Sequence, residues 1–114
     1  MCFLCSLTNV TSLELLAVNI NNFGGVLPEC ISNFSSTLRI LAVDNNNIVG
    51  TIPSGITNLV NLEFLAMSNN KLSGNIPPDI GKLKRLHKMY LDIMISQETF
   101  CTLLEICVCY SNYL

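Results

Sequence analysis

The amino-acid sequence predicts an open solenoid of the α/β class, in which each repeat adds one short strand to a parallel sheet. Three observations predict it. Leucines recur at a nearly fixed period, an asparagine ends each short apolar stretch, and a glycine followed by a proline stands at one point of every period. Stacked repeats of this kind bury their apolar faces only against their neighbours, so the period itself describes the fold.

A leucine marks the beginning of each repeat. Leu38, Leu62 and Leu86 are 24 residues apart (62 − 38 and 86 − 62), whereas Leu13 precedes Leu38 by 25 because segment 35–37 holds one extra residue. Ten positions keep their phase through three consecutive units of the chain. Periods of roughly 20 to 29 residues with this leucine spacing are typical of leucine-rich repeats.

Each repeat is expected to begin with a short strand that ends at an asparagine. Residues such as Leu41 and Val43 alternate inward with the period of two that strands show. We therefore predict a parallel sheet on the concave face of a horseshoe or right-handed superhelix. The asparagines stand where the chain bends after the strand, and we expect them to be buried as a structural ladder, because an amide both donates and accepts hydrogen bonds. They are Asn21, Asn46 and Asn70.

The second half of each repeat is expected to turn back along the convex face as a 3₁₀ or irregular segment. A glycine permits the turn, since it has no side chain to hinder a left-handed backbone. The proline that follows fixes φ and favours an extended path. The glycine–proline pairs are Gly25 with Pro28, Gly50 with Pro53, and Gly74 with Pro77.

The repeat pattern divides the chain into four parts. Residues 1–12 are part of a preceding repeat, 13–85 are three full repeats and 86–91 begin a fourth. The pattern fails after that, because Met94 stands where the next asparagine is due. We therefore expect 92–114 to be a divergent tail on an internal fragment, produced by a truncation, a mis-spliced reading frame or a retained intron.

Charge and hydropathy argue against two kinds of partner. The net charge is −2 and the pI is near 5.1, whereas nucleic-acid binding needs a basic stripe. The apolar stretch 93–110 contains Gln97, Glu98 and Glu105, which makes it too polar for a membrane span. The first residues also lack the basic segment of a secretory signal. We expect a chain that, by itself, is soluble and not exported.

The reactive side chains do not form a catalytic or metal-binding pattern. His87 is the only histidine, and no nucleophile or paired carboxylate accompanies it in the sequence. The spacing of the cysteines fits no regular disulfide framework, and we expect them to be buried or free thiols. They are Cys2, Cys5, Cys30, Cys101, Cys107 and Cys109. The sequence therefore predicts a protein that is not an enzyme and that holds no cofactor and no metal.

The segment after each asparagine identifies the type of repeat. It reads Phe23-Gly-Gly-Val-Leu-Pro28, Ile48-Val-Gly-Thr-Ile-Pro53 and Leu72-Ser-Gly-Asn-Ile-Pro77. These segments resemble the plant-specific leucine-rich repeat, with its Leu-Ser-Gly-x-Ile-Pro signature. Such repeats occur in plant receptor-like kinases, receptor-like proteins and polygalacturonase-inhibiting proteins, and 59–83 is most similar to the receptor-like serine/threonine kinases.

The resemblance implies a longer parent protein at the plasma membrane, with its repeats on the extracellular face. Such a parent would have a signal peptide, capping cysteine pairs, a membrane span and a cytoplasmic kinase. The present sequence has no glycine-rich phosphate loop, no His-Arg-Asp loop and no Asp-Phe-Gly triplet, so no kinase activity is carried over to it.

The strand phase predicts a candidate binding surface on the concave face. An alanine column, which continues to Tyr90, forms a shallow groove between an apolar and a polar column. Such a groove suits an extended peptide, because it offers apolar anchors beside hydrogen-bonding groups. The flanking residues are Leu15, Ile40, Phe64 and Lys88 on one side and Asn19, Asp44, Ser68 and Asp92 on the other. The alternative is that these residues are only solvent-facing and that the ligand site lies elsewhere in the parent.

Two further surface features follow from the sequence. The glycosylation sequons Asn9-Val-Thr11 and Asn33-Phe-Ser35 fall at one repeat phase on the expected convex side. A basic run between Lys82 and Lys88 is expected to be a solvated face, with an acidic partner as the alternative.

The predicted function is recognition of a peptide or protein ligand, with a co-receptor as a further partner, by part of the ectodomain of a plant receptor-like kinase. Two alternatives remain open. One is a stand-alone inhibitor or decoy module, and the other is a truncated relic without a function.

Overall fold

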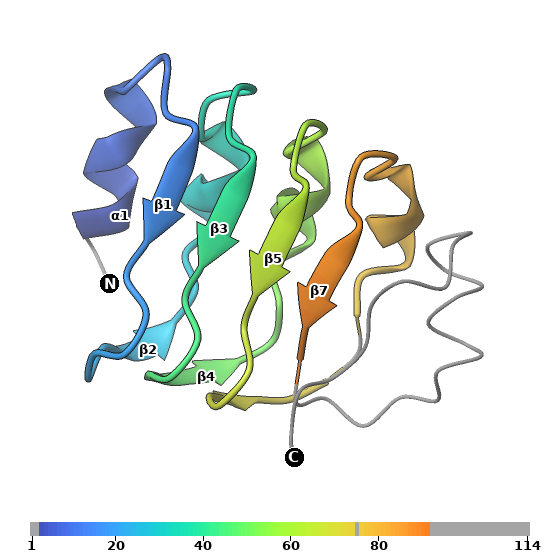
Figure 1. Cartoon of the computed structure of the whole chain (residues 1–114). Coiled ribbons are helices and arrows are strands. Elements are labelled where there is room, and N and C mark those ends of the chain that lie inside the picture. The colour runs from blue at the N-terminus through green and yellow to red at the C-terminus, as the bar shows by residue number, and fades with distance from the viewer. Residues whose placement is uncertain (1–2, 75, 92–114) are drawn as a thin grey trace.

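The computed structural model describes residues 3–74 and 76–91 and shows a stack of turns, each with one strand on the same face (Figure 1). The main sheet, sheet A, contains β1 (Leu15–Ala17), β3 (Ile40–Ala42), β5 (Phe64–Ala66) and β7 (Lys88–Tyr90). All three pairings are parallel, and each strand pairs with the next in the phase of the repeat. The α/β leucine-rich-repeat solenoid that the sequence predicts is confirmed.

A second parallel sheet, sheet B, forms along one edge of the stack. It contains β2 (Gly24–Val26), β4 (Asn47–Gly50) and β6 (Lys71–Leu72). Its register does not follow the repeat phase, because Gly25 pairs with Ile48 and not with Gly50. A slip of two residues displaces neighbouring strands by about 6 to 7 Å along their length. Sheet B is therefore staggered, whereas sheet A is aligned. The apolar periodicity of the sequence does not indicate this stagger.

Short helical segments cover the convex side. They are α1 (Phe3–Ser6), η1 (Leu7–Asn9), η2 (Glu29–Asn33), η3 (Ser54–Asn58) and η4 (Pro78–Lys82), of which all but α1 are 3₁₀ helices. A proline with extended backbone precedes both η2 and η3, as the sequence predicts. One isoleucine from each of η2, η3 and η4 points into the core and is fully buried, namely Ile31, Ile56 and Ile80.

The core lies between sheet A and the convex helices. Leu41 and Leu65, at the centres of their strands, are fully buried, and so are Leu38 and Leu62, which begin the same repeats. Each such side chain contributes about 1.5 to 3 kcal/mol when it leaves water. Because neighbouring repeats supply the same residues at the same height, the core is a set of stacked layers.

The asparagines form hydrogen bonds that join one repeat to the next. The Asn46 amide nitrogen donates to the carbonyls of Val43 in its own repeat (3.0 Å) and Val18 in the preceding one (3.1 Å). Its carbonyl oxygen accepts from the backbone N–H of Phe23 at 3.2 Å. Asn70 repeats the pattern one turn further on, where it accepts from the N–H of Ile48.

Asn21 differs from the other two asparagines. Its amide donates to the carbonyls of Val18 and Asn19, both within its own repeat, and its side chain is exposed. The expectation that all three asparagines are buried therefore holds for Asn46 alone, since Asn70 is half-buried and Asn21 is exposed. Asn21 is exposed because sheet A begins at β1, so among the described residues no earlier strand covers it.

The extra residue of the first full repeat is held by hydroxyl groups. Ser35 Oγ donates to the carbonyl of Thr11 at 2.7 Å, and Thr37 Oγ1 donates to the carbonyl of Leu13 at 2.8 Å. The two hydroxyls also contact each other at 2.7 Å. These bonds attach the longer turn to the preceding repeat, and for this reason the insertion does not disturb the register of β1 with β3.

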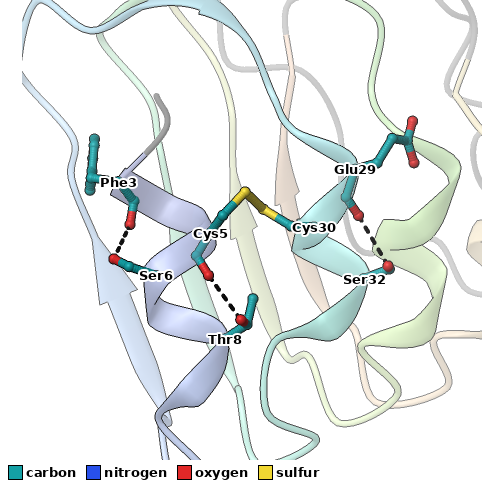
Figure 2. The surroundings of a disulfide bond; sticks show 7 residues. All are labelled: Phe3, Cys5, Ser6, Thr8, Glu29, Cys30 and Ser32. Carbon is teal, nitrogen blue, oxygen red and sulfur yellow. Dashed lines mark hydrogen bonds between the residues drawn. A yellow bond between two sulfur atoms is a disulfide. The ribbon is translucent and has the colours of Figure 1, made fainter.

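A disulfide joins the N-terminal helix α1 to the 3₁₀ helix η2 on the convex side (Figure 2). Cys5 of α1 bonds to Cys30 of η2, with a Cα–Cα distance of 5.6 Å. The expectation of buried or free thiols is therefore wrong for this pair. The pairing arises in three dimensions, because α1 packs beside η2 and buries Leu4 completely. The other four cysteines lie outside the described residues.

The backbone takes a left-handed conformation at the same place in each repeat, just before the asparagine. The residues there are Ile20 (φ 57°), Asn45 (φ 59°) and Asn69 (φ 56°). Asparagine adopts this conformation more readily than most residues, whereas a β-branched side chain is strained in it. Ile20 is also 75% exposed, so it contributes little to the core in return.

We predict that Ile20→Asn stabilises the fold by about 0.5 to 1 kcal/mol, because it relieves part of the left-handed strain. The measurement is urea unfolding of the two proteins. Ile20→Val is the matched control, since it keeps the β-branch, and it should bring no gain. Equal stability of the two variants would contradict the strain at this position.

Candidate functional site

The open face of sheet A carries an apolar stripe that crosses the strands. Leu15 of β1 is 54% exposed, and Ile40, Phe64 and Tyr90 on the next three strands are half-buried. The rings of Phe64 and Tyr90 contact each other, with their centroids 5.5 Å apart. Leu15, Ile40 and Phe64 share one phase of the repeat and therefore line up across three strands, whereas Lys88 stands at this phase on β7. Tyr90, at the alanine phase of β7, extends the stripe through its contact with Phe64.

The alanine column forms the floor beside this stripe. Ala42 and Ala66 are 8% and 6% exposed, since their side chains are short and their neighbours rise above them. Ala17, on the first strand, is exposed. This low exposure of Ala42 and Ala66 fits the shallow floor that the sequence predicts.

The polar border is less regular than expected. Asn19 and Asp44 are half-buried, and Asp44 accepts a hydrogen bond from the Asn45 amide at 2.8 Å. Ser68 is only 3% exposed, so the expectation that it faces solvent is wrong. Its short side chain lies below the level of the surrounding surface, as those of the alanines do. Lys88 is exposed, and Asp92 lies outside the described residues.

A column of alternating charge, which the sequence reasoning missed, lies at the beginning of the strands. Arg39 is placed between Glu63, at 2.9 Å, and Glu14, at 3.6 Å. Together with Thr37, Asn61 and Arg85 these three residues line a shallow open pocket. Each charge directly follows the first leucine of its repeat, so the repeat alignment contained the signal as opposite charges at one phase.

The electrostatics of the column follow from its geometry. The hydrogen bond from Arg39 holds the pKa of Glu63 below its usual value, and the charges of Arg39, His87 and Arg85 act in the same direction. The same hydrogen bond, with the charge of Glu63, raises the pKa of Arg39. Both groups therefore remain charged at neutral pH, and the column is a persistent ionic border of the apolar stripe.

The lowered pKa of Glu63 has a consequence for stability. A carboxylate whose pKa is lower in the folded state contributes stability above its unfolded pKa, about 4.3, and loses it as the pH falls through the folded value. We predict that Glu63→Gln lowers the urea midpoint at pH 7 and that the difference from the parent shrinks as the pH falls below the unfolded pKa of the carboxyl group. If the difference in urea midpoint persists unchanged in acid, the charge of Glu63 is not the cause of the lost stability.

The basic run near the C-terminal end of the described chain is divided among different surroundings. Lys82 pairs with Asp79 of the same 3₁₀ helix at 3.5 Å, whereas Arg85 and His87 lie near Glu63. Lys88 lies on β7. The run is exposed, as expected, but it does not gather into one cationic patch.

Both sequons are exposed on the convex side. Asn9 ends η1 and Asn33 ends η2. The two sites are connected, because the hydroxyl of Ser35 in the second sequon donates to the carbonyl of Thr11 in the first. Sheet A, which carries the apolar stripe, lies on the opposite face of the stack from the helical segments that carry both sites (Figure 1).

The described part of the chain has no metal-binding cluster, because no group of three or more histidine, cysteine, aspartate or glutamate side chains within it is arranged to hold a metal ion. No helix within residues 3–74 and 76–91 is long and apolar enough to cross a bilayer.

Comparison with known proteins agrees with this architecture. The Leucine Rich Repeat family model matches residues 37–59 and 61–83. A search of curated protein sequences gave no match. Among solved structures, the chain is similar to the leucine-rich-repeat ectodomain of the membrane receptor kinase GASSHO1/SCHENGEN3 from Arabidopsis thaliana, in complex with CASPARIAN STRIP INTEGRITY FACTOR 2. That likeness has 32% identity and a TM-score of 0.69, over 76% of this chain and 11% of the receptor.

Two further structures show the range of the similarity. The plant peptide hormone receptor RGFR1, in complex with RGF2, is 30% identical with a TM-score of 0.77, over 94% of this chain and 18% of its own. The leucine-rich-repeat protein LIC12759 from Leptospira interrogans is 28% identical with a TM-score of 0.80, over 93% of this chain and 27% of its own. The chain thus spans between about a tenth and a quarter of the length of these relatives.

The fold, the repeat phase and these likenesses define the class of the protein, which is a leucine-rich-repeat solenoid. More particularly, its repeats are of the kind found in the ectodomains of plant receptor kinases.

Proposed function

We propose that the open face of sheet A recognises an extended peptide or protein segment, as part of the extracellular region of a plant receptor kinase. The observation that carries the proposal is the apolar stripe from Leu15 to Tyr90, bordered by polar groups on one side and the charge column on the other. Aromatic and aliphatic anchors within a polar rim are the usual composition of a binding surface.

The relatives support a ligand of this class. The structures of GASSHO1/SCHENGEN3 and RGFR1 each contain a bound factor, and the latter is described as a peptide hormone receptor. In this chain an extended peptide would lie across the alanine floor, with apolar side chains against Phe64 and polar groups near Asp44. A co-receptor as a second partner belongs to the same proposal.

The test uses linear peptides selected from a random display library on the disulfide-intact chain. We predict that the selected peptides carry apolar anchors and that Phe64→Ala weakens their binding about tenfold or more, the loss of a central anchor. Val49→Ala is the matched control, because Val49 is an exposed apolar residue of sheet B and not of sheet A. Equal loss with both variants, or no effect of Phe64→Ala, would contradict the proposal.

An extracellular location is also part of the proposal. Disulfides form and persist in oxidising compartments, and the bond between Cys5 and Cys30 closes across two separate segments of the fold. The exposed sequons Asn9 and Asn33 suit the same compartment, since glycans on the convex side leave sheet A free.

We predict that the chain, secreted from a plant cell behind an added signal peptide, carries a glycan on each sequon. Treatment with a peptide-N-glycosidase should lower the mass by that of two glycans. The substitutions Asn9→Gln and Asn33→Gln should each remove one of these glycans. Asn58→Gln is the control, because Asn58 has the same repeat phase and lacks the hydroxyl residue. A secreted protein of unmodified mass would count against these sites.

A further inference from the structure

The second glycosylation sequon, Asn33-Phe34-Ser35, is divided between the surface and the core. Asn33 is exposed at the end of η2. Phe34, in the middle of the sequon, is only 5% exposed and belongs to the hydrophobic core. The folded chain can therefore carry a glycan on Asn33, but the rest of the sequon is part of the packing of the fold.

The hydroxyl group of this sequon is engaged by the fold as well. Ser35 Oγ donates to the carbonyl of Thr11 at 2.7 Å and accepts from the backbone N–H of Thr37 at 3.2 Å. It also lies 2.7 Å from the Thr37 hydroxyl. The sequon requires a hydroxyl at its third position, and in the folded chain this hydroxyl is held by protein partners.

The disulfide holds the same segment from its other end (Figure 2). Cys30 lies three residues before Asn33 in η2 and is bonded to Cys5 of α1, which packs beside η2. To present the sequon to an enzyme, Phe34 would have to leave the core and Ser35 would have to break its hydrogen bonds. Once the disulfide has formed, η2 cannot make this movement independently of α1.

Residues that follow the sequon in the chain complete its burial. η2 packs against η3, and Leu38 donates its backbone N–H to the carbonyl of Ser35 at 3.0 Å. Because synthesis proceeds from the N-terminus, the sequon is made before these partners exist. The sequon is therefore open in the growing chain and closed in the finished fold.

We propose that Asn33 accepts its glycan only before the bond between Cys5 and Cys30 closes, so that the fold sets the order of the two modifications. The inference rests on the extracellular location proposed above, since both reactions belong to the secretory compartment.

The two reactions are independent in their chemistry. In the first, the side-chain nitrogen of Asn33 bonds to C1 of a sugar, the bond from C1 to the oxygen of a lipid diphosphate breaks, the lipid diphosphate leaves, and the amide loses one proton. In the second, the thiols of Cys5 and Cys30 pass two electrons and two protons to a protein disulfide, which becomes a dithiol. Only the fold makes the first reaction depend on the second.

The test offers the finished, disulfide-intact chain to a solubilised oligosaccharyltransferase with a lipid-linked oligosaccharide. The chain is made in bacteria and carries Asn9→Gln, which leaves Asn33 as the only sequon of its own. An Asn-Gly-Thr sequon in a flexible N-terminal tag serves as the internal reference. We expect transfer to Asn33 to be slower than transfer to the tag by about tenfold or more, as for a segment that is exposed only by local unfolding.

The role of the disulfide is tested by combining Cys5→Ser with Cys30→Ser. The rate at Asn33 relative to the tag should rise about tenfold or more, because η2 is then released without α1. Ser6→Ala is the matched control, since Ser6 lies in α1 but donates only to the Phe3 carbonyl of the same helix. This control keeps the disulfide and should leave the rate unchanged.

Two results would overturn the proposal. One is transfer to Asn33 in the disulfide-intact chain that is as fast as transfer to the tag. The other is transfer to Asn33 that stays equally slow after both cysteines are replaced. These rates are measured outside the cell, so their failure is distinguishable from a failure of the extracellular location, which the mass of the secreted chain reports.

Discussion

The structure depends on the hydrogen bonds of the buried asparagines. Where the chain turns sharply after each strand, backbone groups point into the core, and an unpaired polar group there costs several kcal/mol. Asn46 meets this need for two repeats at once, because it donates to Val43 and Val18 and accepts from Phe23. An aliphatic side chain of the same size would remove these bonds and leave the Phe23 N–H without an acceptor. The turn can therefore be both tight and buried, and each repeat is joined to the one before it.

The aligned register of sheet A follows from this constraint, and the surface chemistry follows from the register. Because equivalent residues pair strand to strand, any feature that recurs at one phase becomes a column across the sheet. Three such columns lie side by side: the apolar residues Leu15, Ile40 and Phe64, the alanine floor, and the charge column. A solenoid of this kind can consequently change its ligand by substituting a few outward residues, while the asparagines and inward leucines keep the fold.

The features that depend on phase could be predicted from the sequence. The inward leucines, the asparagine turns, the prolines before the convex helices and the outward columns all follow from periodicity. Glu14 and Arg39 share a phase as well, but they lie one residue before Leu15 and Ile40, which are the first positions that the strand periodicity places outward. The charge column was therefore missed, although an alignment of the repeats places these opposite charges at one phase.

Other features depend on three-dimensional neighbours and have no periodic signal. The bond between Cys5 and Cys30 requires α1 to lie beside η2, and no spacing rule contains that contact. The stagger of sheet B is a register between neighbouring repeats that no repeat of residue types marks. The exposure of Asn21 and the burial of Ser68 likewise depend on what lies next to each residue, and the sequence assigns both the same role as their equivalents.

The most direct test of the role of the asparagines compares Asn46→Ala with Asn21→Ala in urea unfolding. The two residues occupy the same phase, but only Asn46 accepts a hydrogen bond from the repeat before it. Asn46 should be the costlier of the two to remove, by about 1 to 3 kcal/mol, because its loss leaves the backbone N–H of Phe23 without an acceptor, whereas the Val18 and Val43 carbonyls keep their bonds from Asn21 and Asn70. Exchange of the Phe23 amide should accelerate in Asn46→Ala alone. Equal destabilisation by the two substitutions, with Phe23 still protected, would contradict the account in which the asparagine ladder joins the repeats.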